Sequence, residues 1–261
     1  MVPRAVLPTA VPGVCFPGQY QRGFILTKEP IDKCLCCFCR TWFAELSLYS
    51  SANNPFFWTE KDGGLRVVQK LGEDPANSAG MKLGVFIERN GILNQARVER
   101  GCQVNPLTLD DFHVNAAIIP LLRQLKAARF VLIATTNQPG LSRGYQSRGQ
   151  LDRMHQLLRQ SLPIDDILVC PHDETDDCPC RKPKPGLLVE AAFKWRIRLD
   201  GSFVISDKWQ DAGAARAAGC TSVMIHSPWA GNGHRDFMVS DTETAVEKIL
   251  HLVAVENALT V

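Results

Sequence analysis

The chain has 261 residues, of which 45% are hydrophobic and 21% are charged, a composition typical of a globular protein with a buried core. Its 29 basic and 27 acidic residues give a formal net charge of +2 without a long basic run, which argues against binding of nucleic acid through bulk electrostatics. No stretch approaches the roughly 18 apolar residues of a membrane span, and prolines interrupt the amino terminus where a signal peptide needs an apolar segment. We therefore expect a soluble cytoplasmic protein.

Residues 1–80 differ in character from the rest of the chain. Proline and glycine fall at irregular spacing there, and strands do not alternate with helices, so we predict an irregular N-terminal extension over 1–80 and one domain over 81–261. The extension carries a cluster of four cysteines, Cys34, Cys36, Cys37 and Cys39. This cluster leaves open a second metal site, a redox site, an acylation target or a tail without chemical role. The extension is also the candidate surface for binding a protein partner.

From residue 81 onward, buried apolar runs alternate with amphipathic segments. The predicted strands cover 83–87, 130–135, 166–170, 202–206 and 221–226. The predicted helices cover 115–128, 148–160, 186–196, 211–218 and a last segment from Ser240, where Glu243 completes a capping box. This alternation predicts an α/β fold with a Rossmann-like parallel sheet flanked by helices. Because ligands bind at the carboxyl ends of the strands in such sheets, the residues just after each strand carry the functional information.

Polar side chains follow four successive strands of the predicted sheet. They are Glu88 and Asn90 after the first strand, Thr136 and Asn137 after the second, Arg181 and Lys182 after the third, and Asp207 and Asp211 after the fourth. Carboxylates suit a hard cation such as Mg²⁺, and hydroxyl, amide and basic groups suit phosphate oxygens. Alternatively, these residues are polar only because loops are exposed to solvent. That explanation suffices for any one strand end, but it does not account for four strand ends with complementary chemistry. The sequence therefore predicts a magnesium-dependent phosphoryl site.

A second group of residues has the composition of a metal site. Three cysteines and a histidine lie close together in the loop after the third strand, at Cys170, His172, Cys178 and Cys180. A Cys₃His set suits tetrahedral Zn²⁺, and four protein ligands leave no open coordination position, so we predict a structural zinc ion. Reduced thiols without a metal are the alternative.

Over about residues 81–226 the chain resembles the haloacid-dehalogenase superfamily, and within it the cap-poor histidinol-phosphate and heptose-bisphosphate phosphatases. The matching segments are 86–91 for Asp-Arg-Asp-Gly, 136–144 for the Thr-Asn-Gln motif, 170–183 for the Cys/His loop and 206–211 for Gly-Asp-Lys-x-x-Asp. The resemblance implies a zinc loop that presents Arg181 and Lys182 to a substrate phosphate. It also implies that Mg²⁺ binds the first carboxylate, the backbone carbonyl of the second acidic position and the aspartate after the fourth strand. The stretch 94–114 is too short for a cap domain.

The first motif departs from the family pattern. In the family the first aspartate attacks phosphorus and the second protonates the leaving group, but this chain has Glu88 and Asn90 at those positions. The extra methylene of Glu88 moves the carboxylate by roughly an ångström, a displacement that can cost about a hundredfold in rate. Asn90 cannot transfer a proton, and loss of acid–base help typically costs about 10²–10⁴-fold. We therefore expect an impaired or inactive phosphatase domain, a pseudoenzyme, that keeps its metal at Glu88, Asn90, Asp207 and Asp211 and still binds a small phosphorylated molecule.

Two other functions fit the same residues. One is an active Mg²⁺-dependent phosphatase for a small sugar phosphate or amino-alcohol phosphate, with Glu88 as the nucleophile. The other is a non-catalytic scaffold subunit whose N-terminal extension binds a partner protein. Turnover of phosphate esters distinguishes the active enzyme from the impaired domain, and phosphate binding without turnover distinguishes the impaired domain from the scaffold.

Overall fold

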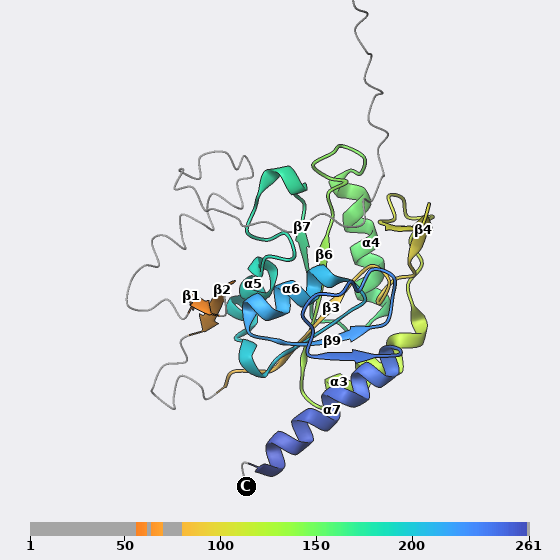
Figure 1. Cartoon of the computed structure of the whole chain (residues 1–261). Helices are drawn as coiled ribbons and strands as arrows, with labels where there is room; N and C mark the ends of the chain where they lie inside the picture. Colours follow the sequence, from red (N-terminus) through yellow and green to blue (C-terminus); the bar gives the residue numbers. More distant parts are fainter. Residues whose placement is uncertain (1–55, 62–63, 70–79, 260–261) are drawn as a thin grey trace, which may run out of the picture.

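The computed structural model describes residues 56–61, 64–69 and 80–259 (Figure 1). A six-stranded sheet with the order β10-β9-β8-β3-β6-β7 forms the centre, and every neighbouring pair of its strands is parallel. The strands are β3 (Gly84–Glu88), β6 (Val131–Asn137), β7 (Asp166–Cys170), β8 (Phe203–Ser206), β9 (Thr221–Ile225) and β10 (Phe237–Val239). The predicted α/β fold with a parallel sheet is confirmed. Five strands lie within two residues of their predicted bounds, and the short edge strand β10 was not predicted.

Within the described residues, five α-helices flank the sheet: α3 (Ile119–Ala127), α4 (Arg148–Ser161), α5 (Gly186–Trp195), α6 (Trp209–Ala218) and α7 (Thr242–Leu259). The short 3₁₀ helices Ala116–Ile118, Glu174–Asp176 and Leu199–Gly201 lie in the connections. Helix α4 begins with a capping box between Ser147 and Gln150. The capping box predicted at Ser240 does not form, because the carboxylate of Asp241 accepts the hydrogen bond from the Thr244 backbone N–H at 2.8 Å and α7 begins at Thr242.

The central strand β3 is buried on both faces of the sheet. Its residues Val85 and Ile87 belong to one apolar core, which they share with side chains of α3, α4 and α7. Phe86 points to the opposite face and packs with side chains of α5 and α6. A central parallel strand covered on both faces explains the continuous apolar run in this part of the sequence. The same strand carries Glu88 to the carboxyl end of the sheet, where it pairs with Thr135 of β6.

The part of the chain that the structure describes also contains two antiparallel hairpins outside this sheet. Strands β4 (Arg97–Glu99) and β5 (Cys102–Val104) form a small hairpin between β3 and α3, in the stretch where a cap domain would be inserted. Strands β1 (Phe56–Lys61) and β2 (Gly64–Gln69) form the other, and β2 lies against α6. The β1–β2 hairpin falls within the extension that the sequence analysis treated as irregular, and it was not predicted. The Cys34–Cys39 cluster lies outside the described residues.

The length and hydropathy of the helices show whether any of them could span a membrane. Among the described residues, none of the helices combines the length and the apolar character that crossing a bilayer requires.

Candidate functional site

The carboxyl ends of β3, β6 and β8 bring the predicted phosphoryl-site residues together. Glu88 is the last residue of β3, Asp207 directly follows β8, and Asp211 lies in the first turn of α6. Lys182 comes from the loop after β7, and its Nζ contacts Glu88 Oε2 and lies 2.6 Å from Asp211 Oδ1. Two carboxylates and one ammonium group thus meet in the interior, as the strand-end argument predicted.

Glu88 and Lys182 are both buried and both charged. Burial raises the pKa of Glu88, but the ammonium groups of Lys182 and Lys208 and the hydrogen bond from the Asn90 N–H outweigh it and lower the pKa to about 2. Burial lowers the pKa of Lys182, but Asp211 and Glu88 raise it above its usual value. The Asn90 N–H donates to Glu88 Oε1 at 3.0 Å, so both oxygens of this carboxylate are held in place. An ionised, fixed carboxylate can bind a cation or attack an electrophile.

The Asn90 side chain is occupied by neighbouring protein groups. Its Oδ1 accepts two hydrogen bonds from the Arg89 guanidinium, at 3.1 Å from Nε and 2.9 Å from Nη2, and its Nδ2 donates to Asn105. Arg89 is fully buried, with Nη1 3.0 Å from Nε2 of His155 and its guanidinium 5.3 Å from the ring centre of Phe112. The amide of Asn90 is therefore a structural link, and it has no proton to give at neutral pH.

Burial shifts the protonation of the Arg89 and His155 pair. Burial lowers the pKa of His155 to about 3, and the positive charge of Arg89 adds to this effect. Burial also lowers the pKa of Arg89 to about 10, while Glu88 opposes the shift. At neutral pH Arg89 is charged and His155 is neutral, so Nε2 of the imidazole accepts the hydrogen bond from the guanidinium.

The acidic residues fit a divalent cation. Within the described part of the chain, Oδ1 of Asp207 and Oδ2 of Asp211 are buried and have no hydrogen-bond partner. Burial raises the pKa of Asp207, and it raises the pKa of Asp211 to about 6 against the opposing effect of Lys182. Buried carboxylate oxygens without partners are costly unless a cation satisfies them. The donor set, all oxygen, suits Mg²⁺.

The other residues predicted to bind phosphate do not all face the same site. Thr136 is buried at the end of β6, where its Oγ1 accepts a 2.7 Å hydrogen bond from Gln138. Asn137 holds the backbone of Lys182: its Nδ2 donates to the Lys182 carbonyl at 3.1 Å and its Oδ1 accepts from the Lys182 N–H at 3.2 Å. Arg181 instead faces the Cys/His loop, where its guanidinium bonds to the His172 carbonyl and to Glu174. Lys182 therefore lies beside Glu88 in the candidate phosphoryl site, and Asn137 holds its backbone.

Three residues that contact the site were missed by the sequence analysis. Lys208 Nζ lies 2.7 Å from the Asn90 carbonyl oxygen and 3.2 Å from Glu88 Oε1. On the β4–β5 hairpin, Gln103 donates to Asp207 Oδ2 at 3.3 Å. Asn105, which follows β5, links Asn90 to the carbonyl of Asn137. The signal for Lys208 was present, because it adjoins Asp207, whereas the short hairpin has no periodicity that could reveal its role.

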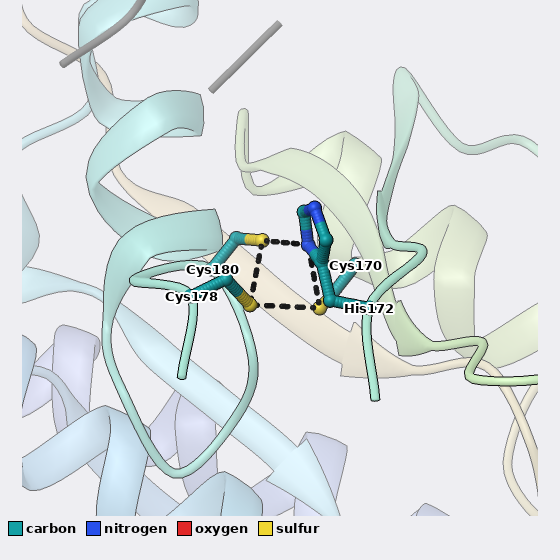
Figure 2. A group of neighbouring side chains, drawn as sticks. All are labelled: Cys170, His172, Cys178 and Cys180. Atoms are coloured by element: carbon teal, nitrogen blue, oxygen red, sulfur yellow. Dashed lines mark hydrogen bonds between the residues drawn. The ribbon is translucent and has the colours of Figure 1, made fainter. Parts of the chain in front are cut away.

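The Cys/His loop forms a compact four-ligand group (Figure 2). Neighbouring ligand atoms lie 3.6 Å apart for Cys170 and Cys178, 3.4 Å for Cys178 and Cys180, 3.2 Å for Cys180 and His172 Nδ1, and 3.7 Å for His172 Nδ1 and Cys170. All four ligand atoms lie within 4.8 Å of one another. A tetrahedron with metal–sulfur bonds of about 2.3 Å has edges of about 3.8 Å, so the group has the size of a tetrahedral metal site.

The loop closes tightly against the start of α5. The Gly186 N–H donates to the Pro179 carbonyl at 3.1 Å, and a Cβ at position 186 would lie 2.4 Å from the same oxygen. Only glycine permits this approach. The close contact fixes Cys178 and Cys180 relative to Cys170, which comes from the end of β7.

Comparisons with known proteins find phosphatases among the relatives of this chain. The family model described as HAD-hydrolase-like matches residues 179–246. The chain is 35% identical over 133 residues to D-glycero-beta-D-manno-heptose-1,7-bisphosphate 7-phosphatase from Helicobacter pylori, over 49% of this chain and 73% of that protein. It is 31% identical over 171 residues to the protein of the same name from Pseudomonas putida, over 64% of this chain and 93% of that protein.

A solved structure shares the fold. The crystal structure of D,D-heptose 1,7-bisphosphate phosphatase from B. bronchiseptica, complexed with magnesium and phosphate, aligns with a TM-score of 0.57 and 26% identity, over 66% of this chain and 99% of that one. The parallel sheet, its carboxylate-lined edge and these likenesses define a phosphatase fold of the haloacid-dehalogenase type. The chain belongs to the haloacid-dehalogenase (HAD) phosphatase family.

Proposed function

We propose that the chain binds a small phosphorylated sugar together with Mg²⁺ and hydrolyses its phosphate ester with Glu88 as the nucleophile, at a rate limited by the lack of a carboxyl group at position 90. The observation that carries the proposal is the buried, ionised Glu88 carboxylate, held between Lys182 and the Asn90 N–H. The names of the relatives, which are heptose-bisphosphate phosphatases, support the substrate class.

The metal site of this proposal uses oxygens at the carboxyl ends of β3 and β8. Glu88, the backbone carbonyl of Asn90 and Asp207 would hold Mg²⁺, and Asp211 lies beside them with an unpartnered oxygen. The magnesium and phosphate in the structure of the B. bronchiseptica relative support this assignment. Bound there, Mg²⁺ would neutralise charge on the phosphate oxygens.

Particular residues of this chain would carry out the steps of the proposed hydrolysis. Lys182 would stabilise negative charge on the transferring phosphoryl group, because its buried ammonium lies beside Glu88. A Glu88 oxygen would form a bond to phosphorus while the ester P–O bond breaks, and the departing alkoxide would take its proton from water. Water would then cleave the glutamyl phosphate and release inorganic phosphate. Because Asn90 neither protonates the leaving group nor activates the attacking water, both steps are expected to be slow.

A second candidate is a domain that binds the phosphorylated sugar without turnover. The specific observation in its favour is the Asn90 side chain, whose amide bonds to Arg89 and Asn105 rather than being free to assist a leaving group. The scaffold function expected from the N-terminal extension depends on residues that lie mostly outside the described part of the chain.

Two further elements belong to the proposal. We infer that the Cys/His group holds a structural Zn²⁺, because its ligand spacing and its closed set of four ligands suit that ion. The cytoplasmic location remains a prediction of the sequence.

Phosphate release from a heptose bisphosphate and from an aryl phosphate, with and without Mg²⁺, tests the proposal. We expect slow Mg²⁺-dependent turnover that Glu88→Gln abolishes, with Lys184→Met as a control, since Lys184 pairs with Asp177 in the Cys/His loop. If the unmodified chain hydrolyses these esters no faster than Glu88→Gln but binds phosphate in calorimetry, the chain is a binding domain instead. Absence of both would leave the scaffold function.

A further inference from the structure

The Lys208 ammonium lies among the oxygens that form the proposed metal site. Its Nζ is 2.7 Å from the Asn90 carbonyl oxygen, 3.2 Å from Glu88 Oε1 and 4.0 Å from Asp207 Oδ1. These atoms come from the end of β3 and from the residue after β8, and Lys208 itself is the residue that precedes α6. One lysine thus lies within 4.0 Å of all three groups that the proposed function assigns to Mg²⁺.

An ammonium in this position and a magnesium ion cannot share the site. Mg²⁺ would need direct bonds to these same oxygens, including the Asn90 carbonyl oxygen to which Lys208 Nζ now donates. Like charges that close together repel strongly in a buried setting. The ammonium and the metal would therefore compete for the same oxygens.

The two lysines of the site differ in how firmly they are held. Lys182 is buried, with its side chain 2% exposed, and it bridges Glu88 and Asp211. The Lys208 side chain is 18% exposed, so it has a path to solvent. A strongly hydrated ammonium on a flexible four-carbon stem can move to water at modest cost. Lys208 is the cation that can leave.

The charges of the site favour this competition. Three carboxylates, Glu88, Asp207 and Asp211, face the two ammonium groups of Lys182 and Lys208, and the buried Arg89 guanidinium acts on Glu88 through its charge. An aspartate at position 90 would add a fourth carboxylate and favour a further cation. With Asn90 in that place, Lys208 already neutralises the oxygens that would attract a metal.

We propose that Lys208 is an internal competitor for the metal site, which Mg²⁺ must displace from the Asn90 carbonyl, Glu88 and Asp207 before it binds. This inference rests on the proposed function, because it takes the same three groups as the metal ligands. It assigns to Lys208 the control of metal affinity: the site binds Mg²⁺ more weakly than its carboxylates alone would. Without Mg²⁺, the Lys208 ammonium takes over the stabilisation of the Glu88 carboxylate.

Calorimetric titration of Mg²⁺ into the full-length protein tests the competition. Lys208→Met should bind Mg²⁺ about tenfold more tightly or better, because the metal no longer has to break the charge-assisted contacts of the ammonium. Lys184→Met should bind like the unmodified chain. The titrations should be repeated at two salt concentrations. If the variant binds more tightly only because a positive charge is missing nearby, high salt should remove the difference. If Lys208 competes directly for the oxygens, the difference should persist, because salt screens close, partly buried contacts much less.

Chemical labelling of the unmodified protein gives a readout that needs no variant. Acetic anhydride should acetylate Lys208 faster in the presence of Mg²⁺ than in its absence, as measured by mass spectrometry of the peptide, while labelling of Lys184 stays constant. The displaced ammonium moves toward solvent, so its reactivity rises.

The outcomes separate the inference from the function on which it rests. Equal Mg²⁺ affinity of the unmodified chain and Lys208→Met, or slower labelling of Lys208 with Mg²⁺, would overturn the competition and leave the metal site standing. Failure of both proteins to bind Mg²⁺, with unchanged thermal unfolding, would overturn the metal site and the competition together. Tighter binding by the variant that persists at high salt would support both.

Discussion

The Arg89 guanidinium donates two hydrogen bonds to Oδ1 of Asn90, its neighbour in the chain, from Nε at 3.1 Å and from Nη2 at 2.9 Å. A buried arginine thereby holds the side chain at the position where the family has its acid–base aspartate. Because the acceptor is a neutral amide, the arrangement fixes Asn90 without giving it a proton to transfer. An aspartate at this position would meet the same guanidinium as a charged partner.

Restoring both aspartates should raise the rate of hydrolysis. In Glu88→Asp with Asn90→Asp, the nucleophile regains its reach and a carboxyl group lies two residues away, so we expect Mg²⁺-dependent turnover of an aryl phosphate to increase about 10²-fold or more. Each single change should recover much less, because the two groups act together. Phosphate release at saturating Mg²⁺ measures the effect.

Glu88→Gln with Asn90→Asp is the matched control, and it should remain inactive because it lacks a nucleophile. A double aspartate variant that binds Mg²⁺ and phosphate but hydrolyses nothing would contradict the prediction. In that case the two substitutions of the first motif would not be the cause of slow chemistry.

The residues at the carboxyl edge of the sheet were predictable, because the apolar runs in the sequence show where each buried strand ends. Glu88, Lys182 and Asp211 were all assigned to one site from the sequence, and the structure places them in contact. The direction of Arg181 was not predictable, because a guanidinium can reach several partners and here it bonds within the Cys/His loop. The role of Lys208 depends on which of two neighbouring ammonium groups faces Glu88 Oε1, which only the packing decides.

The sequence analysis missed the two hairpins for different reasons. Strands β4 and β5 have three residues each, too few for an alternating pattern to be recognised. The β1–β2 hairpin does carry a signal, because its strands are separated by Asp62-Gly63, a dipeptide typical of two-residue hairpin turns. The irregular spacing of proline and glycine in the rest of the extension obscured it.

His155 should make the protein less stable in acid. Its pKa is lowered to about 3 in the folded protein, against an ordinary value of 6.5, so the unfolded chain binds more protons at this residue than the folded one between these values. The free energy of unfolding should therefore fall as the pH drops from 6.5. This single group contributes a loss on the order of 3 kcal/mol by pH 4.

Urea unfolding of the unmodified chain and of His155→Gln between pH 4 and 7.5 measures this contribution. The glutamine oxygen can still accept from Arg89 but does not titrate, so the difference between the two proteins should shrink or change sign as the pH falls. His251→Gln, at an exposed position of α7, is the control. Parallel pH profiles for the unmodified chain and His155→Gln would refute the role of this histidine.

The Cys/His group should hold about one zinc ion per chain. Cys178→Ser removes one of four ligands, so the variant should lose the metal and unfold at a lower temperature than Cys102→Ser, which changes a cysteine outside the group. Elemental analysis and thermal unfolding measure the two effects. Protein prepared without chelator that contains no zinc would contradict the assignment, as would equal melting temperatures of the two variants.

The domain boundary near residue 81 predicts that a fragment of residues 81–261 folds alone. The sheet, its five flanking helices and both candidate sites lie within this fragment, so it should be soluble and unfold cooperatively. A fragment of residues 56–261 should unfold at a higher temperature, because β2 lies against α6 and covers part of that helix. In the full-length chain, limited proteolysis should cut before residue 80 well before it cuts the domain. Circular dichroism melting curves of the two fragments make the comparison: precipitation of 81–261, or its unfolding without a cooperative transition, would mean that the β1–β2 hairpin is an integral part of the fold.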